Sequence, residues 1–286
     1  MIIEILLFTF FGIGLGTVVG LLPGAHINNI LPLILSLSFF FTSPYYLAVF
    51  IVSIAVTQIF ISYIPSIFFG APDENTALSV LPGHKLLLEG RGHEAIKLTI
   101  VGGIGALITS LIFISVFANY FVRLYEISRP YIQYAIALVV LIMIVMEKKL
   151  KRILATTLII ALSGFFGVLV LNSSLVTQQN VLFPVLSGMF GLSTIIISIS
   201  QRAKIPEQQE DSTMQIKNLD IIKSILLGSV AGIIVGFLPA IGVSQAATMV
   251  QYLGGMGDAR AFLVSLSGIN VANEVFSLKD KNGKEI

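Results

Sequence analysis

The chain has 286 residues, of which 56% are hydrophobic and only 11% are charged, and its mean hydropathy is +0.95. A soluble domain carries about 25% charged residues, so this composition indicates a membrane protein. Because a spanning helix needs about 20 apolar residues, the length allows at most about ten spans. With no Cys, three scattered His and a net charge of +2, the sequence predicts no disulfide, metal or cofactor site and no nucleic-acid partner.

Ten apolar stretches alternate with polar or Gly/Pro-rich segments. Backbone groups in lipid must be hydrogen-bonded internally, so we predict an all-α polytopic membrane protein of about 8–10 transmembrane or re-entrant helices. The second and ninth stretches are too short or too polar for full spans, which predicts re-entrant or broken helices there. The stretches are 2–22, 27–42, 45–65, 95–119, 131–147, 152–171, 181–200, 219–238, 241–253 and 259–278.

The basic residues predict the orientation in the membrane. The only dense cluster lies at 148–152, and Arg202 and Lys204 follow two stretches later. Short loops rich in Lys and Arg stay in the cytoplasm, so both segments are predicted to be cytoplasmic. The resulting division is a first membrane repeat at 1–200 with a cytoplasmic loop at 66–94, a flexible cytoplasmic linker at 201–218, the start of a second repeat at 219–278 and a polar tail at 279–286.

An internal repeat joins the two halves. A shift of 216 positions aligns EILLFTFFGIGLGTVVGLLPGAHINN from Glu4 with DIIKSILLGSVAGIIVGFLPAIGVSQ from Asp220. Three glycines at four-residue spacing coincide in the copies, which is typical of a helix face that packs closely on another helix. Each copy then ends in Gly-x-Leu-Pro followed by small and polar residues, which predicts a helix that breaks and restarts at a binding site. The copies run antiparallel or parallel, depending on whether residues 27–42 cross the membrane.

Further residues carry a family resemblance. The runs GLLPGAHINNILPL and FFGAPDENTALSVLPGHKLLLEGRGHEAIKLTIVGG resemble the TctA family, the large permease subunit of tripartite tricarboxylate transporters. GFLPAIGVSQAATMVQYL and GDARAFLVSLSGINVANE resemble the start of that family's second half. The sequence departs from the family pattern at Pro239, which is followed by Ala240 instead of Gly. It also reaches the hydrophilic KDKNGKEI soon after Glu274, from which we expect a shortened or truncated member.

The resemblance implies a secondary transporter in the cell membrane for small carboxylate anions such as di- or tricarboxylates. It also implies an extracytoplasmic solute-binding protein and a small membrane subunit as partners. We expect the broken segments and the loop between them to hold the anion through helix N-terminal amides and polar side chains. The predicted substrate-binding residues are Gly20, Pro23, Gly24, Asn28, Asn29, Gly70, Pro72, Asn75, Gly236, Pro239, Gly242 and Ser244.

The energy source is predicted to be an ion gradient, because the sequence has no nucleotide-binding loop. An anion entering against an inside-negative potential costs about 2.3 kcal/mol per charge per 100 mV, so a co-transported sodium ion or proton is expected. The predicted ligands are Asn270, Asn273 and Glu274, which lie in an otherwise apolar stretch. The alternative for Glu274 is a carboxylate that snorkels at a helix end near Lys279.

Two other functions stay open. The chain could be an assembly subunit of the membrane without transport activity. Gly255-Met256-Gly257-Asp258 also fits the Gly-x-Gly-Asp signature of intramembrane aspartyl proteases, whose second carboxylate could only be Asp220. Because this four-residue match is weak in a chain with 25 Gly, we expect a transporter and no enzyme.

Overall fold

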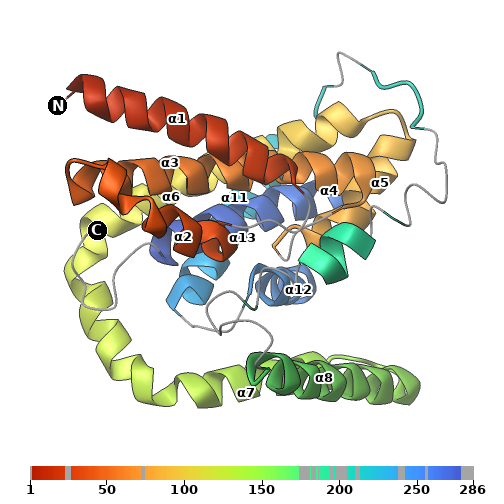
Figure 1. Cartoon of the computed structure of the whole chain (residues 1–286). Helices are drawn as coiled ribbons and strands as arrows, with labels where there is room; N and C mark the ends of the chain where they lie inside the picture. The colour runs from red at the N-terminus through yellow and green to blue at the C-terminus, as the bar shows by residue number, and fades with distance from the viewer. Residues whose placement is uncertain are drawn as a thin grey trace.

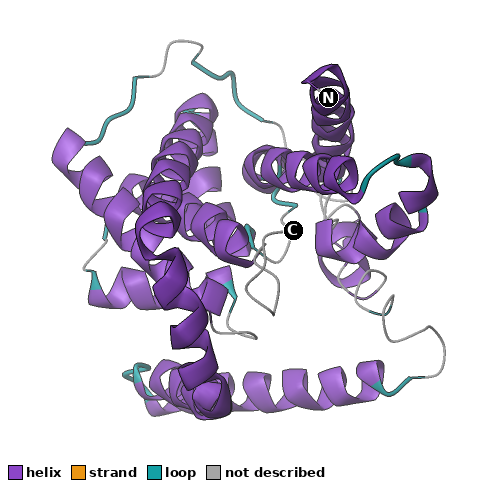
Figure 2. Cartoon of the chain, turned by 90° about the vertical axis from the view of Figure 1, so that its left-hand side faces the viewer, coloured by secondary structure: helices purple, strands orange, loops and turns teal. Residues whose placement is uncertain are grey.

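The computed structural model describes residues 2–22, 27–71, 75–173, 181, 185, 187–193, 196, 205–209, 213–237, 242–254 and 257–277. Within these ranges the chain is helical and contains no strand (Figures 1 and 2). Among the described helices, five are long and apolar enough to cross a membrane: Ile2–Leu21, Pro44–Phe69, Gly92–Phe117, Leu150–Leu171 and Asn218–Gly236. The predicted all-α polytopic fold is therefore confirmed.

The first repeat contains two long helices that pack through glycines. A β-carbon at Gly12 would lie 2.6 Å from Ser53 Cβ, and one at Gly16 would lie 2.7 Å from the Ile54 carbonyl oxygen. The predicted close packing of this glycine face is therefore confirmed. Because residue numbers rise together along the contact, the two long helices are parallel. The elements are α1 (Ile2–Leu21), the short α2 (Ile27–Ser36) and α3 (Pro44–Ile61).

The second repeat has the same three elements: α11 (Asn218–Phe237), α12 (Val243–Leu253) and α13 (Ala259–Ser277). Gly228 packs on Ser265 and Gly232 packs on Ile269, so α11 and α13 are parallel as well. The starts of α1 and α11, at 2 and 218, differ by 216, those of α2 and α12, at 27 and 243, also by 216, and those of α3 and α13, at 44 and 259, by 215. The repeat therefore covers three elements, of which the sequence comparison identified the first helix and the break.

The two repeats have opposite directions. Helix α6 (Gly92–Ser128) is parallel to α13, because Gly102 packs on Val264 and Ala106 lies beside Gly268. It is antiparallel to α3 and to α4 (Tyr63–Phe69), which continues α3: Ile59 shares a cluster with Ala106, whereas Ile67 shares one with Ala95 and Leu98. The pair α1–α3 is thus antiparallel to α11–α13, as Figure 1 allows the reader to follow. This inverted-topology repeat, common in secondary transporters, decides the alternative that the sequence left open.

Residues 66–94, expected as a cytoplasmic loop, form helices that enter the core. Helix α4 is closed by Gly70 at φ 60°, where a side chain would be strained. After a short 3₁₀ turn (Ala77–Ser79), α5 (Val80–Leu88) buries Leu86 and Leu87 against Ile67 and the start of α6. Leu86 and Leu87 of the Leu run therefore belong to the core, whereas Leu88 is exposed. The side of the membrane on which this segment lies stays a prediction.

The chain leaves the core through the distal part of α6, which extends well beyond the predicted end at 119. It continues into α7 (Ile132–Val145) and α8 (Leu150–Leu171). None of the residues of α8 is buried, and Figures 1 and 2 show α7 and α8 set apart from the other helices. Such an apolar, uncovered helix faces lipid in a membrane. The predicted stretch at 181–200 lies largely outside the described residues.

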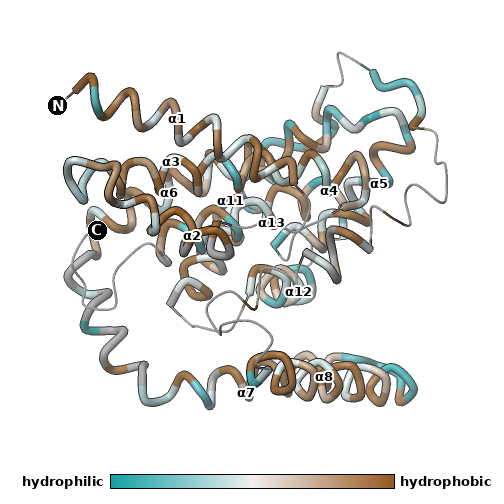
Figure 3. Tube along the Cα trace, viewed as in Figure 1, coloured by the Kyte–Doolittle hydropathy of each residue, from teal (hydrophilic) through white to brown (hydrophobic). Residues whose placement is uncertain are grey.

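Hydrophilic segments gather at one end of the molecule. Figure 3 shows them on the right, in the described linker segments 205–209 and 213–217 and at the turn between α7 and α8. We call this the charged end; it also contains the first turns of α6 and α13. The shared end agrees with the prediction that the basic loops lie on one side of the membrane, although the identity of that side stays a prediction.

Candidate functional site

Each glycine-rich helix, α1 or α11, ends against the backbone of a partner-helix residue that carries a side-chain amide. At the end of α1, a β-carbon on Gly20 would lie 2.7 Å from Ile61 Cβ and 3.0 Å from the backbone carbonyl oxygen of Gln58. At the end of α11, one on Gly236 would lie 2.7 Å from Phe276 Cβ and 3.2 Å from the backbone carbonyl oxygen of Asn273. Since α3 and α13 are related by a shift of 215, with starts at 44 and 259, Gln58 and Asn273 are equivalent positions.

Polar side chains on α3 and α13 are buried far from the charged end. Gln58 is 1% exposed, Asn270 is 2% exposed and Glu274 is 6% exposed. With a rise of about 1.5 Å per residue, Asn270 lies about 16 Å and Glu274 about 22 Å along α13 from its start at the charged end. Polar groups buried at this depth of a membrane protein are usually functional. The burial of Glu274 inside the protein also disfavours a snorkelling side chain.

Asn270 has an acceptor atom that the described protein does not satisfy. Its Oδ1 is buried and has no hydrogen-bond partner among the described residues. Leaving such an acceptor unsatisfied costs about 1–3 kcal/mol, so it needs a physical explanation. A bound cation or water that this oxygen would coordinate provides one.

We call Gly20 with Gln58, and Gly236 with Asn273, the two half-sites. They lie close together in the core. Ile59, the neighbour of Gln58, packs in one cluster with Val271 and Phe276, which flank Asn273 along α13. Sequence reasoning predicted Asn270, Asn273 and Glu274 but missed Gln58. The missing signal was the shift of 215, with starts at 44 and 259, which aligns IAVTQIFIS of α3 with INVANEVFS of α13.

Other predicted site residues have local structural roles. Gly70 caps α4, and Asn75, 9% exposed, precedes the 3₁₀ turn, where the hydroxyls of Ser66 and Ser79 lie 2.7 Å apart. Gly242 is the N-cap of α12 and donates its N–H to Gln245 Oε1 at 3.0 Å. The backbone N–H of Gly242 is therefore already hydrogen-bonded within the protein. The predicted Ser244 lies in the first turn of α12.

Several predicted residues cannot be placed. Asn28 and Asn29 lie in the first turn of α2, but their side chains are outside the described part of the chain. Their roles and those of the break residues therefore stay predictions. The predicted residues outside the described ranges are Pro23, Gly24, Pro72 and Pro239.

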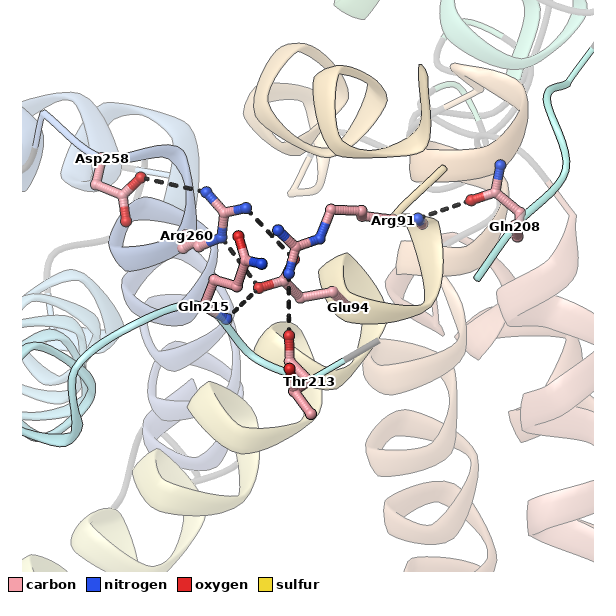
Figure 4. A network of polar contacts seen from close by, with 8 residues as sticks. Arg91, Glu94, Gln208, Thr213, Gln215, Asp258 and Arg260 are labelled. Carbon is pink, nitrogen blue, oxygen red and sulfur yellow. Dashed lines mark hydrogen bonds and ion pairs between the residues drawn. The ribbon is translucent and has the colours of Figure 1, made fainter. Parts of the chain in front are cut away.

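A buried ionic network organises the charged end (Figure 4). Glu94, on α6, is fully buried; its Oε2 lies 2.8 Å from Arg91 Nη2, and its Oε1 lies 3.0 Å from Arg260 Nε. The N–H of Gln215 also donates to Oε1 at 2.6 Å, and Arg91 Nη2 donates to the Thr213 carbonyl at 3.0 Å. Because both guanidinium groups are directed at Glu94, the network joins the linker to both helices rather than presenting positive charge to an anion.

The linker, expected to be flexible, is hydrogen-bonded where it is described. Gln208 donates from Nε2 to the Leu87 carbonyl at 3.1 Å and accepts from the Gly92 N–H at 2.8 Å. The N–H of Gln209 donates to the carbonyl of Gly90 at 2.8 Å. The end of α5 and the start of α6 leave backbone groups without helical partners, and the polar linker satisfies them.

The carboxylates of the protease-like motif lie at the charged end. Asp258 is half exposed and lies 4.0 Å from Arg260 Nη1, and Asp220 is exposed in the first turn of α11. A shared-proton pair needs two carboxylates buried together. These two surface positions do not favour protease chemistry.

Comparison with known proteins agrees with a transporter. The model of the tripartite tricarboxylate transporter TctA family matches residues 6–279. A protein of Methanocaldococcus jannaschii, described as uncharacterized, is 34% identical over 284 residues, which cover 96% of this chain and 68% of that protein. No solved structure matches the chain. The family match over nearly the whole chain, together with the membrane-spanning helices, shows that this multi-pass membrane protein belongs to the tripartite tricarboxylate transporter TctA family.

Proposed function

We propose that the chain is a permease that moves small carboxylate anions, such as di- or tricarboxylates, by secondary transport. The observation that carries the proposal is the inverted repeat, in which each glycine-rich helix, α1 or α11, ends against the backbone of a residue with a side-chain amide, the buried Gln58 or the partly buried Asn273. Interrupted helices at equivalent places of two repeats mark the binding site in many secondary transporters. An extracytoplasmic solute-binding protein and a small membrane subunit would be its partners.

The anion would lie between the two half-sites. Gln58 can donate two N–H groups to a carboxylate, and the short helices α2 and α12 begin directly after the breaks. The first turn of a helix offers backbone N–H groups and the positive end of its dipole to an anion. Asn28 and Asn29 in α2 and Ser244 in α12 would add side-chain donors from the same turns.

A cation would enter with the anion. Glu274 places a carboxylate inside the protein at membrane depth, and the Asn270 Oδ1 lacks a donor among the described residues. Oxygen ligands of this kind suit a hard cation, and a carboxylate also suits a proton. With Asn273, these residues would couple uptake of the anion to a sodium or proton gradient.

Uptake of labelled citrate and succinate into vesicles from cells that produce the full chain tests the proposal. A sodium or proton gradient should stimulate uptake, Gln58→Ala should lower it by about tenfold or more, and Glu274→Gln should abolish the stimulation. The exposed residues Gln133 and Asp220 provide the matched controls Gln133→Ala and Asp220→Asn.

Each possible negative result contradicts a different part of the proposal. Uptake no higher than in vesicles without the protein would contradict transport and favour the non-transporting assembly subunit. Uptake of the anions that neither gradient alters would contradict cation coupling and leave carboxylate transport in place. Equal losses in Gln58→Ala and Gln133→Ala would contradict the role of Gln58.

A further inference from the structure

Helix α6 contains one serine whose hydroxyl group is not used within the described structure. Ser110 is fully buried, and its Oγ has no hydrogen-bond partner among the described residues. Hydroxyls elsewhere on this helix donate to a carbonyl one turn earlier, as Thr109 does to Gly105 at 2.8 Å and Ser115 does to Leu111 at 2.8 Å. The ordinary local hydrogen bond of a helical serine therefore does not account for Ser110.

The register between α6 and α13 places Ser110 level with the predicted cation ligands. Near the start of the contact, Ser267 Oγ donates to the Thr99 carbonyl at 2.6 Å. Two turns further along α6 and one turn further along α13, Ala106 packs with Val271 and Ala272 in one cluster. Both helices rise by about 1.5 Å per residue in the same direction, so the next turn of α6 lies beside the last turns of α13. That turn of α6 contains Ser110, and those turns of α13 contain Asn270 and Glu274.

Apolar side chains of the first repeat pack beside the contact between α6 and α13. Phe60 packs on the Gly103 position of α6, and Ile59 belongs to the cluster that contains Ala106 and Val271. The low dielectric of such an apolar surrounding strengthens the attraction between a cation and its oxygen ligands. The Glu274 carboxylate and neutral oxygens near it could therefore hold a cation at this contact.

We propose that the coupling cation is a sodium ion and that Ser110 Oγ is one of its ligands, together with Asn270 Oδ1 and the Glu274 carboxylate. This inference rests on the cation coupling proposed above. Two neutral acceptor oxygens beside one carboxylate suit a monovalent hard cation, whereas a proton would require only the carboxylate. The ion site then bridges α6 and the second repeat, so that ion binding joins α13 to the helix that contacts both repeats.

Melting of the purified full chain in detergent tests the inference without transport. Sodium chloride should raise the melting temperature relative to choline chloride at equal ionic strength, since a ligand of the folded state stabilises it. Ser110→Ala should raise the sodium concentration for half-maximal stabilisation by about tenfold, and Ser110→Thr, which keeps the hydroxyl, should restore it at least in part.

Ser229→Ala is the matched control. Ser229, on α11, is also fully buried with an Oγ that has no partner among the described residues. It lies one turn after Ile225, which packs on Gly105, and Gly105 and Ser110 are rotated by about 140° from each other around α6. Its removal should therefore leave the sodium dependence unchanged.

The outcomes distinguish this inference from the proposed function. Equal sodium dependence in Ser110→Ala, Ser229→Ala and the unaltered chain would overturn the role of Ser110 while coupling stands. A melting temperature that sodium does not change, with uptake driven by a proton gradient, would overturn the sodium assignment while carboxylate transport stands. A sodium effect lost only in Ser110→Ala would support the site even if the anion carried proves to be of another class.

Discussion

Arg260 of α13 donates from Nε to Oε1 of Glu94 on α6 across 3.0 Å, and the Glu94 side chain is fully buried. Arg91 contacts the other oxygen of the same carboxylate at 2.8 Å. The second repeat is therefore joined to α6 by an ion pair inside the protein at the charged end. Because a buried carboxylate without its counter-charge is costly, this contact leads to a direct stability prediction.

Arg260→Ala should destabilise the protein strongly. Removing one partner of a buried ion pair costs about 3–5 kcal/mol, since the remaining charge loses its compensation. The melting temperature of the purified chain measures the effect, and Lys217→Ala, at an exposed position of the linker, is the control. A melting temperature equal to that of the control would show that Arg91 alone compensates Glu94.

Gly16→Val should disrupt the packing of α1 on α3. A β-carbon there would lie 2.7 Å from the Ile54 carbonyl oxygen, so the helices would have to separate at a cost of about 1–3 kcal/mol. Gly14→Val is a close control, because a β-carbon at Gly14 would meet nothing within 4 Å. Thermal unfolding of the two variants in detergent gives the comparison, and similar melting temperatures would argue against tight packing of α1.

Gln208→Ala should loosen the linker. The side chain makes three hydrogen bonds, one within the linker to Pro206 and two that join the linker to Leu87 and Gly92. Loss of the two joining bonds costs about 1–3 kcal/mol. Limited proteolysis within the linker should therefore be faster by about tenfold, whereas Glu207→Ala, which changes an exposed neighbour, should leave it unaltered. Identical cleavage of both variants would indicate that the linker is already loose.

The membrane orientation can be tested with single cysteines, because the chain has none. Glu207→Cys lies at the charged end, and Asn172→Cys lies at the end of α8 away from its basic start. The positive charge of the loops predicts that an impermeant thiol reagent labels Asn172→Cys in intact cells and Glu207→Cys only after permeabilisation. The reverse pattern would invert the assigned orientation.

The glycine-rich helices α1 and α11 show which features a local sequence pattern can predict. The repeat, with a shift of 216 from Glu4 to Asp220, could be identified because both copies have the same glycine spacing. The role of those glycines in close packing also followed from their spacing, since residues four apart share a helix face. The direction of one copy relative to the other could not be predicted from the sequence. It depends on whether the segment between α1 and α3 crosses the membrane, and the sequence pattern of a short helix does not show this.

Gln58 shows where sequence reasoning stops. One polar residue in an apolar helix has no assigned partner until the neighbouring helices are placed, and only the packing of α3 puts it beside Gly20 and near the turns of α13 that contain Asn273. Ser110 is similar, because serine is common in membrane helices and its unused hydroxyl is visible only when its surroundings are known.

Composition and periodicity alone determined that this chain is a helical, multi-pass membrane protein with a repeated, broken helix, because apolar length and glycine spacing are local properties of the sequence. The tertiary structure alone decided that the repeats are inverted, that α4 and α5 bury Ile67, Leu86 and Leu87 in the core and that α6 lies beside the predicted cation ligands. These features depend on contacts between residues far apart in the chain, such as Arg260 with Glu94, and helix direction and depth are set by the packing of all the helices together.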